Sequence, residues 1–132
     1  MLVINEKEVP EKAVPGRFLR WVVSRTEGLP SEECSFCVMR VQPKETVRPA
    51  HSHPDCEELV YFISGRGHVY VDGVITPVSE GSAVLFPKNS VHMVRNSGEE
   101  EMKVACFFSA ATDLAHYAFH PDTCFDEGVS CE

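Results

Sequence analysis

The feature that most limits the folds open to this chain is a series of short apolar segments separated by turn residues. Each segment is rich in β-branched and aromatic residues, and they recur about every 8–12 residues, as the strands of sandwiches and barrels do. The segments span residues 35–41, 58–64, 68–71, 74–78, 82–87, 90–96 and 102–109. No helical pattern lies between them, so the sequence predicts an all-β fold.

One turn is specified directly by its residue types. Asp72-Gly73 separates two apolar stretches, and this dipeptide favours a type I′ turn because both central residues of that turn need positive φ. The stretch 68–78 is therefore predicted to be a tight hairpin. Further turns are expected at 87–89 and 96–99, where proline, asparagine and glycine occur.

The two ends of the chain differ from this regular middle. Residues 1–20 are predicted to form an arm or an edge strand, with a turn at 14–18. The C-terminal segment is expected to be either helical or irregular: 111–120 could form a short helix with Thr112 as its N-cap, and 121–132 are polar and irregular. We expect a single domain over 1–132, with a barrel core at about 35–108 and a C-terminal segment at 109–132.

Charge and hydropathy exclude some classes of partner. The formal net charge of −8 argues against nucleic acid or an anionic membrane surface as the main partner. No apolar run approaches the roughly 20 residues of a membrane-spanning helix. The first residues are charged and lack the apolar region of a signal peptide, so the expected location is cytoplasmic.

The six cysteines raise the question of a thiolate zinc site. Cys34 and Cys37 form the only CxxC pair, and a structural zinc site needs four ligands. No second CxxC or HxxxH pair supplies the other two, so Cys124 and Cys131 would have to complete the site from a distance. Free thiols are therefore the favoured interpretation.

A denser group of metal-ligand residues lies between 51 and 58. His51 and His53 are two residues apart, so on a strand both imidazoles point to the same face. Pro54 interrupts the strand, and the following turn can bring a carboxylate back beside the two rings. Exposed loop histidines and a solvated glutamate pair are the alternative interpretation.

The carboxylate could come from either of two adjacent glutamates. Glu57 and Glu58 must face opposite sides of the strand, because strand neighbours alternate. Both faces of this strand are apolar: Glu58 shares its face with Val60 and Phe62, and Glu57 shares its face with Leu59, Tyr61 and Ile63. Periodicity therefore leaves the choice open.

A third histidine changes the balance in favour of a metal site. His92 lies within the predicted strand 90–96, between Val91 and Met93, where an isolated histidine would ordinarily be a core residue. On an inward face across a barrel from His51 and His53, it would instead supply a third imidazole to one centre.

These residues resemble the paired motifs of the cupin superfamily. The first motif, G-x5-H-x-H-x3–4-E-x6-G, is matched from the first histidine onward, with Glu45 at its opening glycine. The second, G-x5-P-x-G-x2-H-x3-N, is matched except for Asn89 at its internal glycine, and asparagine tolerates the left-handed backbone that glycine supplies there. The resemblance covers about residues 35–108 and fills these motif positions: His51, His53, Glu58, Gly65, Gly81, Pro87, His92 and Asn96.

The resemblance implies a double-stranded β-helix, that is, a jelly-roll barrel, and it selects Glu58 over Glu57 as the carboxylate. It implies a divalent metal ion (Fe, Mn, Ni, Co, Cu or Zn) held by His51, His53, Glu58 and His92, with coordination positions left open. The expected function is a metalloenzyme acting on a small organic molecule by oxygenase, isomerase, decarboxylase or lyase chemistry. A non-catalytic cupin that binds or senses a small ligand is the alternative, and a homodimer is expected.

Other residues are assigned weaker roles. Val60, Phe62 and Tyr117 are predicted to line the substrate pocket. His116 and His120 are spaced to share one helix face, and that C-terminal segment is predicted to lie either beside the barrel mouth or on the surface. Other residues with functional side chains are predicted to lie outside the centre: His68, Arg66 and Arg95.

Overall fold

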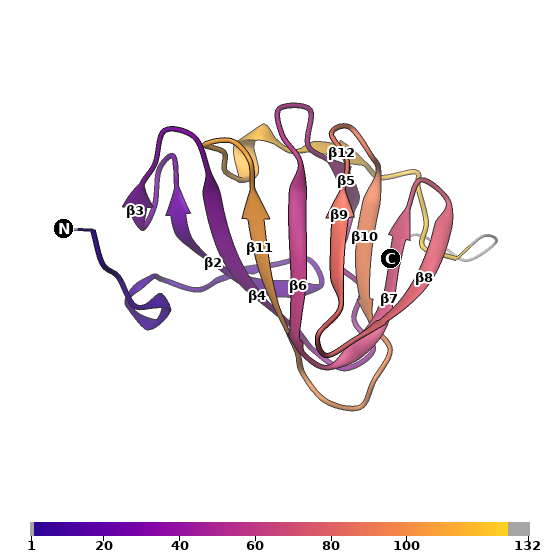
Figure 1. Ribbon diagram of the computed structural model, residues 1–132. Coiled ribbons are helices and arrows are strands. Elements are labelled where there is room, and N and C mark those ends of the chain that lie inside the picture. The colour runs from indigo at the N-terminus through magenta and orange to yellow at the C-terminus, as the bar shows by residue number, and fades with distance from the viewer. Residues whose placement is uncertain (1, 127–132) are drawn as a thin grey trace.

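The computed structural model describes residues 2–126, which form two β-sheets with the main apolar core between them (Figure 1). The larger sheet has, in spatial order, β1 (Lys12–Val14), β2 (Arg17–Ser24), β4 (Ser35–Val41), β11 (Met102–Phe108), β6 (Glu58–Ser64) and β9 (Ala83–Phe86), with β3 (Leu29–Pro30) beside β2. All pairings are antiparallel except the short pairing of β2 with β3.

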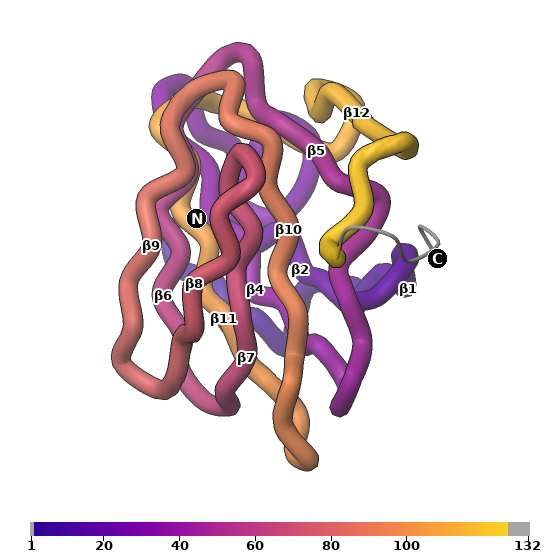
Figure 2. The backbone as a smooth tube through the Cα atoms, turned by 90° about the vertical axis from the view of Figure 1, so that its right-hand side faces the viewer, coloured from indigo at the N-terminus to yellow at the C-terminus, as the bar shows by residue number. Residues whose placement is uncertain are grey.

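The smaller sheet contains five antiparallel strands. Its spatial order is β12 (Ala118–His120), β5 (Ala50–Ser52), β10 (His92–Asn96), β7 (Arg66–Val71) and β8 (Val74–Ser79). In Figure 2 the last of these strands in the chain, β12, runs beside β5, which is far from it in sequence. The prediction of an all-β jelly-roll fold is confirmed.

The core is built by the alternation of side chains along the strands. On β6 the inward residues Val60 and Phe62 are fully buried, while Leu59, Tyr61 and Ile63 point outward and are exposed. Inward residues of the other strands complete the core, among them Leu19, Trp21, Val41, Met102, Val104 and Phe108. Burial of these side chains is the main stabilising contribution, at about 1.5–3 kcal/mol each.

The turn predictions are confirmed by the backbone. Asp72 and Gly73 have φ values of 46° and 90°, so both central residues of the β7–β8 turn adopt the left-handed conformation. Asn89, which replaces the internal glycine of the second motif, has a φ of 68°. The asparagine therefore takes the conformation for which the motif uses glycine.

The C-terminal segment differs from the prediction. The helix expected at 111–120 is a single 3-10 turn, η2 (Leu114–His116), whose N-cap is Asp113 and not Thr112. The chain then extends as β12 and hydrogen-bonds to β5, which satisfies its backbone without further helix. His116 and His120 therefore do not share a helix face, and this part of the prediction is wrong.

At the other end, a 3-10 turn, η1 (Glu6–Glu8), precedes the β1–β2 hairpin. β1 is an edge strand, as expected, but β2 continues to Ser24 and contributes Leu19 and Trp21 to the core. Of the closing segment, residues 121–126 are described, and Phe125 is buried against Ala50 and Met93. Residues 127–132 lie outside the described part. None of the helices in residues 2–126 is long and apolar enough to cross a membrane.

Candidate metal centre

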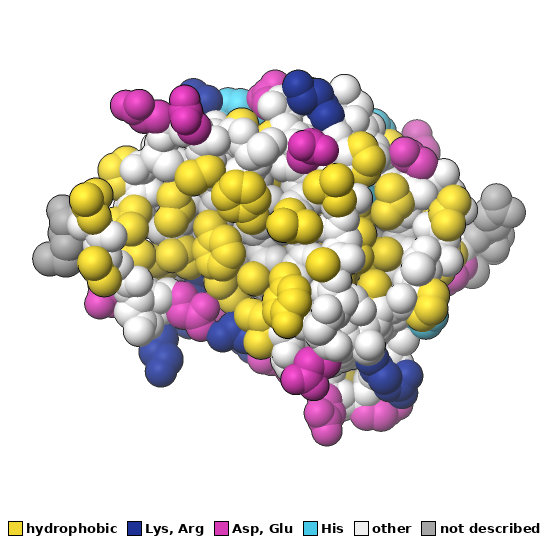
Figure 3. Space-filling view, viewed as in Figure 1, with side chains coloured by type: hydrophobic (Ala, Val, Ile, Leu, Met, Phe, Trp, Pro, Cys, Tyr) yellow, Lys and Arg dark blue, Asp and Glu magenta, His cyan; other side chains and the backbone are white. Residues whose placement is uncertain are grey.

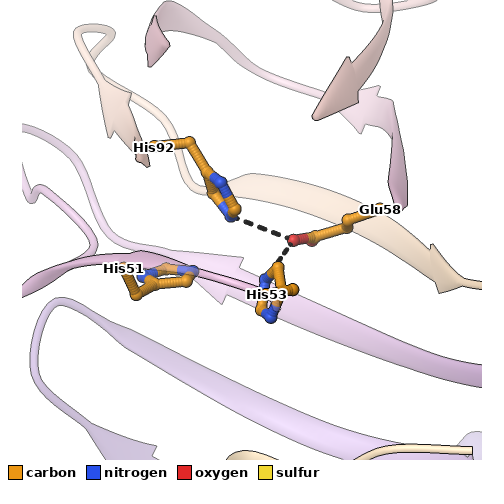
Figure 4. A group of neighbouring side chains, drawn as sticks. All are labelled: His51, His53, Glu58 and His92. Carbon is orange, nitrogen blue, oxygen red and sulfur yellow. Dashed lines mark hydrogen bonds and ion pairs between the residues drawn. The ribbon is translucent and has the colours of Figure 1, made fainter. Parts of the chain in front are cut away.

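Four side chains that are distant in sequence converge between the two sheets (Figure 4). His51 comes from β5, His53 follows that strand, Glu58 begins β6 and His92 begins β10. One ligand atom from each residue lies within 4.8 Å of every other, and all four residues are buried. Glu57, by contrast, is exposed on the outer face.

The pairing of the strands explains this convergence. His51 and His92 are direct partners in the antiparallel ladder between β5 and β10. Glu58 belongs to the other sheet, where it pairs with Phe86 on β9 and Phe108 on β11. The centre is therefore made by both sheets, with imidazoles from one facing a carboxylate from the other.

Backbone carbonyls set the orientation of two of the imidazoles. Nδ1 of His51 lies 3.2 Å from the carbonyl oxygen of Pro49, and Nδ1 of His92 lies 3.0 Å from that of Ser90. A carbonyl only accepts, so each Nδ1 carries the hydrogen and each neutral ring presents the Nε2 lone pair. The Nε2 lone pair is the donor that a metal ion uses.

The lone pair of His92 faces negative charge. Nε2 of His92 lies 3.2 Å from Oε1 of Glu58, and Nε2 of His53 lies 2.8 Å from the same oxygen. The other ring nitrogen of His53, Nδ1, is buried and has no hydrogen-bond partner among the described residues. A lone pair opposite a carboxylate is repulsive unless a proton or a cation lies between them.

Burial and the neighbouring imidazoles set the charge states of the centre. Burial alone would raise the pKa of Glu58, but the imidazoles of His53 and His92, whose Nε2 atoms lie within hydrogen-bond distance of the carboxylate, hold that pKa well below its usual value. Burial lowers the pKa of His51 well below its usual value. Glu58 is thus an anion and His51 is neutral at neutral pH, which are the states that bind metal.

The donor set fits a divalent cation. Nitrogen and oxygen ligands lie about 2.0–2.2 Å from such an ion, so they stand up to about 4.4 Å from one another. The observed limit of 4.8 Å is close to this value, and a small inward movement would close the difference. Three imidazoles and one carboxylate suit several transition metals and do not select one.

Aromatic rings hold the imidazoles in place. The ring of Phe86 stacks on His92, with centroids 3.9 Å apart and an interplanar angle of 7°. Tyr117, which lies between η2 and β12, stacks on His51 at 5.0 Å and meets His53 edge-on at 4.3 Å. These contacts restrict ring rotation, so the centre is largely preorganised.

A narrow cavity of about 20 Å³, enough for about one or two water molecules, adjoins the centre. Tyr117 lines it, whereas Val60 and Phe62 are completely buried in the core and are not among its lining residues. The cavity is lined by Arg17, Leu19, Cys37, Met39, Val47, His51, Glu58, Phe86, His92, Val94, Cys106 and Tyr117.

Of the lining residues that the sequence did not assign to a pocket, three carry functional side chains: Arg17, Cys37 and Cys106. The signal for Arg17 was present, because it shares the inward face of β2 with Leu19 and Trp21. Cys37 and Cys106 are direct partners in the ladder between β4 and β11. Their proximity is a matter of strand pairing and could not be seen in the sequence.

The remaining candidate residues lie outside the centre. His68 bonds to Ser97, and His116 bonds to Asp113. His120 bonds to Ser52, Arg95 forms an ion pair with Asp126, and Arg66 is exposed. Within residues 2–126, the only group of metal-ligand side chains is the one at His51.

The cysteines do not form the four-thiolate zinc site within the described part of the chain. The prediction of free thiols is confirmed for Cys34, Cys37, Cys56 and Cys106. It is wrong for Cys124, which is disulfide-bonded. No spacing pattern around Cys124 in the sequence indicated that bond.

The sequence is similar to those of several known proteins. The protein is 32% identical over 108 residues to the polyketide synthase CurC of Streptomyces cyaneus, covering 81% of this chain and 68% of that protein. It is 36% identical over 98 residues to a probable oxalate decarboxylase of Arthroderma benhamiae. That match covers 70% of this chain but only 24% of the relative, so the chain spans about a quarter of that protein's length.

Solved structures show the same fold at lower identity. An oxalate decarboxylase of B. subtilis superposes with a TM-score of 0.77 at 23% identity, over 90% of this chain and 32% of that one. Pac13, a nucleoside dehydratase from Streptomyces, gives 0.74 at 13% identity, over 91% of both chains. The family model described as a cupin domain matches residues 37–108, which is more than half of the sequence. The chain therefore belongs to the cupin domain family.

Proposed function

We propose that this protein is a metal-dependent enzyme that binds a divalent cation through His51, His53, Glu58 and His92 and acts on a small organic molecule. The observation that carries the proposal is the convergence of four buried donor atoms within 4.8 Å. Buried histidines and a buried carboxylate destabilise a fold unless they are paired or bind a metal. Their position beside a cavity favours a binding or catalytic role.

Some residues of the centre would bind the metal ion, and others fix the orientation of these ligands. The carbonyls of Pro49 and Ser90 fix the tautomers of His51 and His92, so that both Nε2 atoms point at the same volume. Phe86 and Tyr117 exclude water from the faces of these rings. A bound divalent cation would supply Lewis acidity toward a substrate oxygen, or a binding position for O₂.

The relatives favour decarboxylase or lyase chemistry among the classes left open by the sequence. Two of the similar proteins are named oxalate decarboxylases, and one similar structure is a nucleoside dehydratase. Each of these reactions breaks a bond next to an oxygen-bearing carbon, where a Lewis acid stabilises developing negative charge. Oxygenase and isomerase chemistry use the same centre and remain part of the test.

The first experiment measures metal content by elemental analysis of the purified protein. We expect about one equivalent of a divalent transition metal in the wild type, and loss of that metal in the double variant His51→Ala/His92→Ala. The matched control is His68→Ala/His116→Ala, which removes two histidines outside the centre and should retain the metal. Absence of metal from the wild type, or its retention in the first variant, contradicts the proposal.

The second experiment separates an enzyme from a sensor. The metal-loaded protein is incubated with enediols, phenols and keto acids, while oxygen uptake and product formation are followed. Turnover that disappears in the His51→Ala/His92→Ala variant supports an enzyme. Ligand binding without turnover of any compound supports a non-catalytic binding protein instead.

A further inference from the structure

Arg17 is a buried charge beside the candidate metal centre. Only 8% of the residue is exposed, and it lines the same cavity as His51, Glu58 and Tyr117. An arginine is always protonated in proteins, so this charge is permanent.

The guanidinium has no counter-ion among residues 2–126. No hydrogen bond or ion pair joins its side chain to any residue that the structure describes, although its five N–H groups can donate. The neighbouring carboxylate of Glu45 is bonded to Arg48 at 3.1 Å. A buried charge without a partner is costly, which is why such groups normally pair with an anion.

The other six arginines show how unusual this is. Arg66 is exposed to water, where it needs no partner. The other five have acidic or carbonyl partners: Arg20 with Glu11, Arg25 with the carbonyl of Ala111, Arg40 with Glu11 and Glu101, Arg48 with Glu45, and Arg95 with Asp126. Arg17 alone combines burial with the absence of a described partner.

The local fold places Arg17 at the cavity. Gly16, with a φ of 81°, turns the β1–β2 hairpin so closely against the chain that an added Cβ would lie 1.9 Å from the carbonyl oxygen of Thr46. Arg17 follows immediately and points to the same side as Leu19 and Trp21. It also lines a more open hollow with Glu45 and Arg48, so it lies where the cavity approaches the surface.

We propose that Arg17 is the anion-recognition residue of this cavity, and that its ligand is a small carboxylic acid whose carboxylate pairs with the guanidinium. Arginine binds carboxylates in a bidentate manner, which also fixes the orientation of the ligand. The remaining lining is largely apolar, with Leu19, Met39 and Phe86, and suits a compact carbon skeleton. The enclosed volume of about 20 Å³ admits only a few atoms, so the rest of the ligand would lie in the more open hollow that Arg17 also lines.

The charge of the centre agrees with an anionic ligand. This step rests on the proposed function: a divalent cation, the Glu58 carboxylate and the Arg17 guanidinium leave a net charge of about +2 with neutral imidazoles. An acid with one carboxylate on Arg17 and a second oxygen toward the cation would neutralise most of it. The pairing with Arg17 itself does not require the metal.

The test compares carboxylates with their uncharged amides by titration calorimetry, on metal-loaded and metal-free protein. The probes are malonate with malonamide, benzoate with benzamide, and inorganic phosphate. We expect at least one carboxylate to bind about 10-fold or more tightly than its amide. Arg17→Met should weaken that carboxylate by about 10- to 100-fold and leave the metal content unchanged, whereas Arg66→Met should leave both unchanged.

Thermal unfolding of the ligand-free protein gives a second readout. Because Arg17→Met removes an unpaired buried charge, we expect its unfolding midpoint to rise, which a merely structural arginine would not show. Arg17→Lys keeps a charge but loses the bidentate geometry, so its carboxylate affinity should lie between those of the wild type and Arg17→Met.

The outcomes separate this inference from the proposed function. Arg17-dependent carboxylate binding in a protein that holds no metal supports the inference and contradicts the proposed function. The inference alone is overturned if the protein binds metal but binds acids and amides equally tightly. It is also overturned if Arg17→Met leaves the carboxylate affinity unchanged. Binding of phosphate without any carboxylate, or of none of the probes, also overturns it.

Discussion

The two faces of strand β6 distribute polarity in opposite ways. The inward face begins with the carboxylate of Glu58 and continues with fully buried Val60 and Phe62. The outward face carries Leu59, Tyr61 and Ile63, which are 45%, 50% and 41% exposed. A buried charge on one face and exposed apolar side chains on the other reverse the usual pattern of a soluble fold.

The outward apolar residues continue onto neighbouring strands. Leu59 pairs with Leu85 on β9 and with Phe107 on β11, and both partners are also exposed. Figure 3 shows hydrophobic side chains gathered across this face of the larger sheet. We call the five residues Leu59, Tyr61, Ile63, Leu85 and Phe107 the outer patch. Contiguous apolar surface of this kind is typical of interaction sites, and buried polar clusters are typical of functional sites.

Substitutions on the two faces of β6 should differ most in their effect on the free energy of unfolding. Phe62→Ala leaves a cavity in the core and should lower the free energy of unfolding by about 3–5 kcal/mol. Tyr61→Ala, one residue earlier on the outward face, should change it by no more than about 1 kcal/mol in the monomer. Denaturant unfolding of the two variants measures both values. Equal losses would show that the outward face is also packed.

The second comparison uses the two adjacent glutamates. Glu58→Gln removes the anionic donor and should weaken divalent metal binding by about 100-fold, or about 2.7 kcal/mol. Glu57→Gln makes the same chemical change on the exposed face and should leave the affinity unchanged. Competition with a metal-chelating dye measures both. Similar effects of the two substitutions would remove Glu58 from the centre.

The third comparison concerns pH and the metal-free protein. The pKa of His51 is lowered in the folded state, so below about pH 6.5 the unfolded chain binds a proton that the folded chain does not. Stability should therefore fall with falling pH by up to about 1.4 kcal/mol per unit for this one group. Glu58, whose pKa is also lowered, adds a loss below about pH 4.5.

Unfolding measured between pH 8 and pH 5 checks this slope. His51→Gln should flatten it, whereas His68→Gln, which removes a histidine outside the centre, should leave it in place. A wild-type stability that does not change between pH 7 and pH 5 would contradict the burial effect assigned to His51.

The smallest effect on chain stability is expected at the outer patch. The homodimer expected from the sequence stays a prediction, and this patch is the surface on which we place it. A stable dimer buries about 800 Å² on each subunit. Tyr61→Glu or Phe107→Glu should convert a dimer into a monomer in light scattering, with about 1 kcal/mol or less lost from the monomer. A wild-type mass equal to one chain would contradict the prediction.

Much of the architecture was predictable because it depends on local patterns. Alternation and turn residues located the strands from 35 to 108, and the Asp72-Gly73 turn has the predicted backbone. The C-terminal helix is limited to Leu114–His116, because the pairing of β12 with β5 overrides local helix propensity beyond it. No local pattern reports whether a strand edge is available elsewhere in the chain.

The site was predictable in part for a similar reason. The spacing of His51 and His53 indicates one shared face, and the family motif selects Glu58 and His92. The residues that line the pocket could not be predicted in this way. Val60 and Phe62 follow Glu58 on the inward face, but they are packed into the core. Whether an inward residue meets a cavity or another side chain depends on the opposite sheet.

The sequence by itself therefore determined the all-β class, the turns and the identity of the four converging side chains. These properties follow from alternation, from backbone conformations that few residues adopt, and from a motif with fixed spacing. Only the tertiary structure showed that the four side chains meet within 4.8 Å of one another, and that Arg17 lies beside them. Both facts depend on which strands become neighbours, because the pairing of distant strands is set by the packing of the whole core.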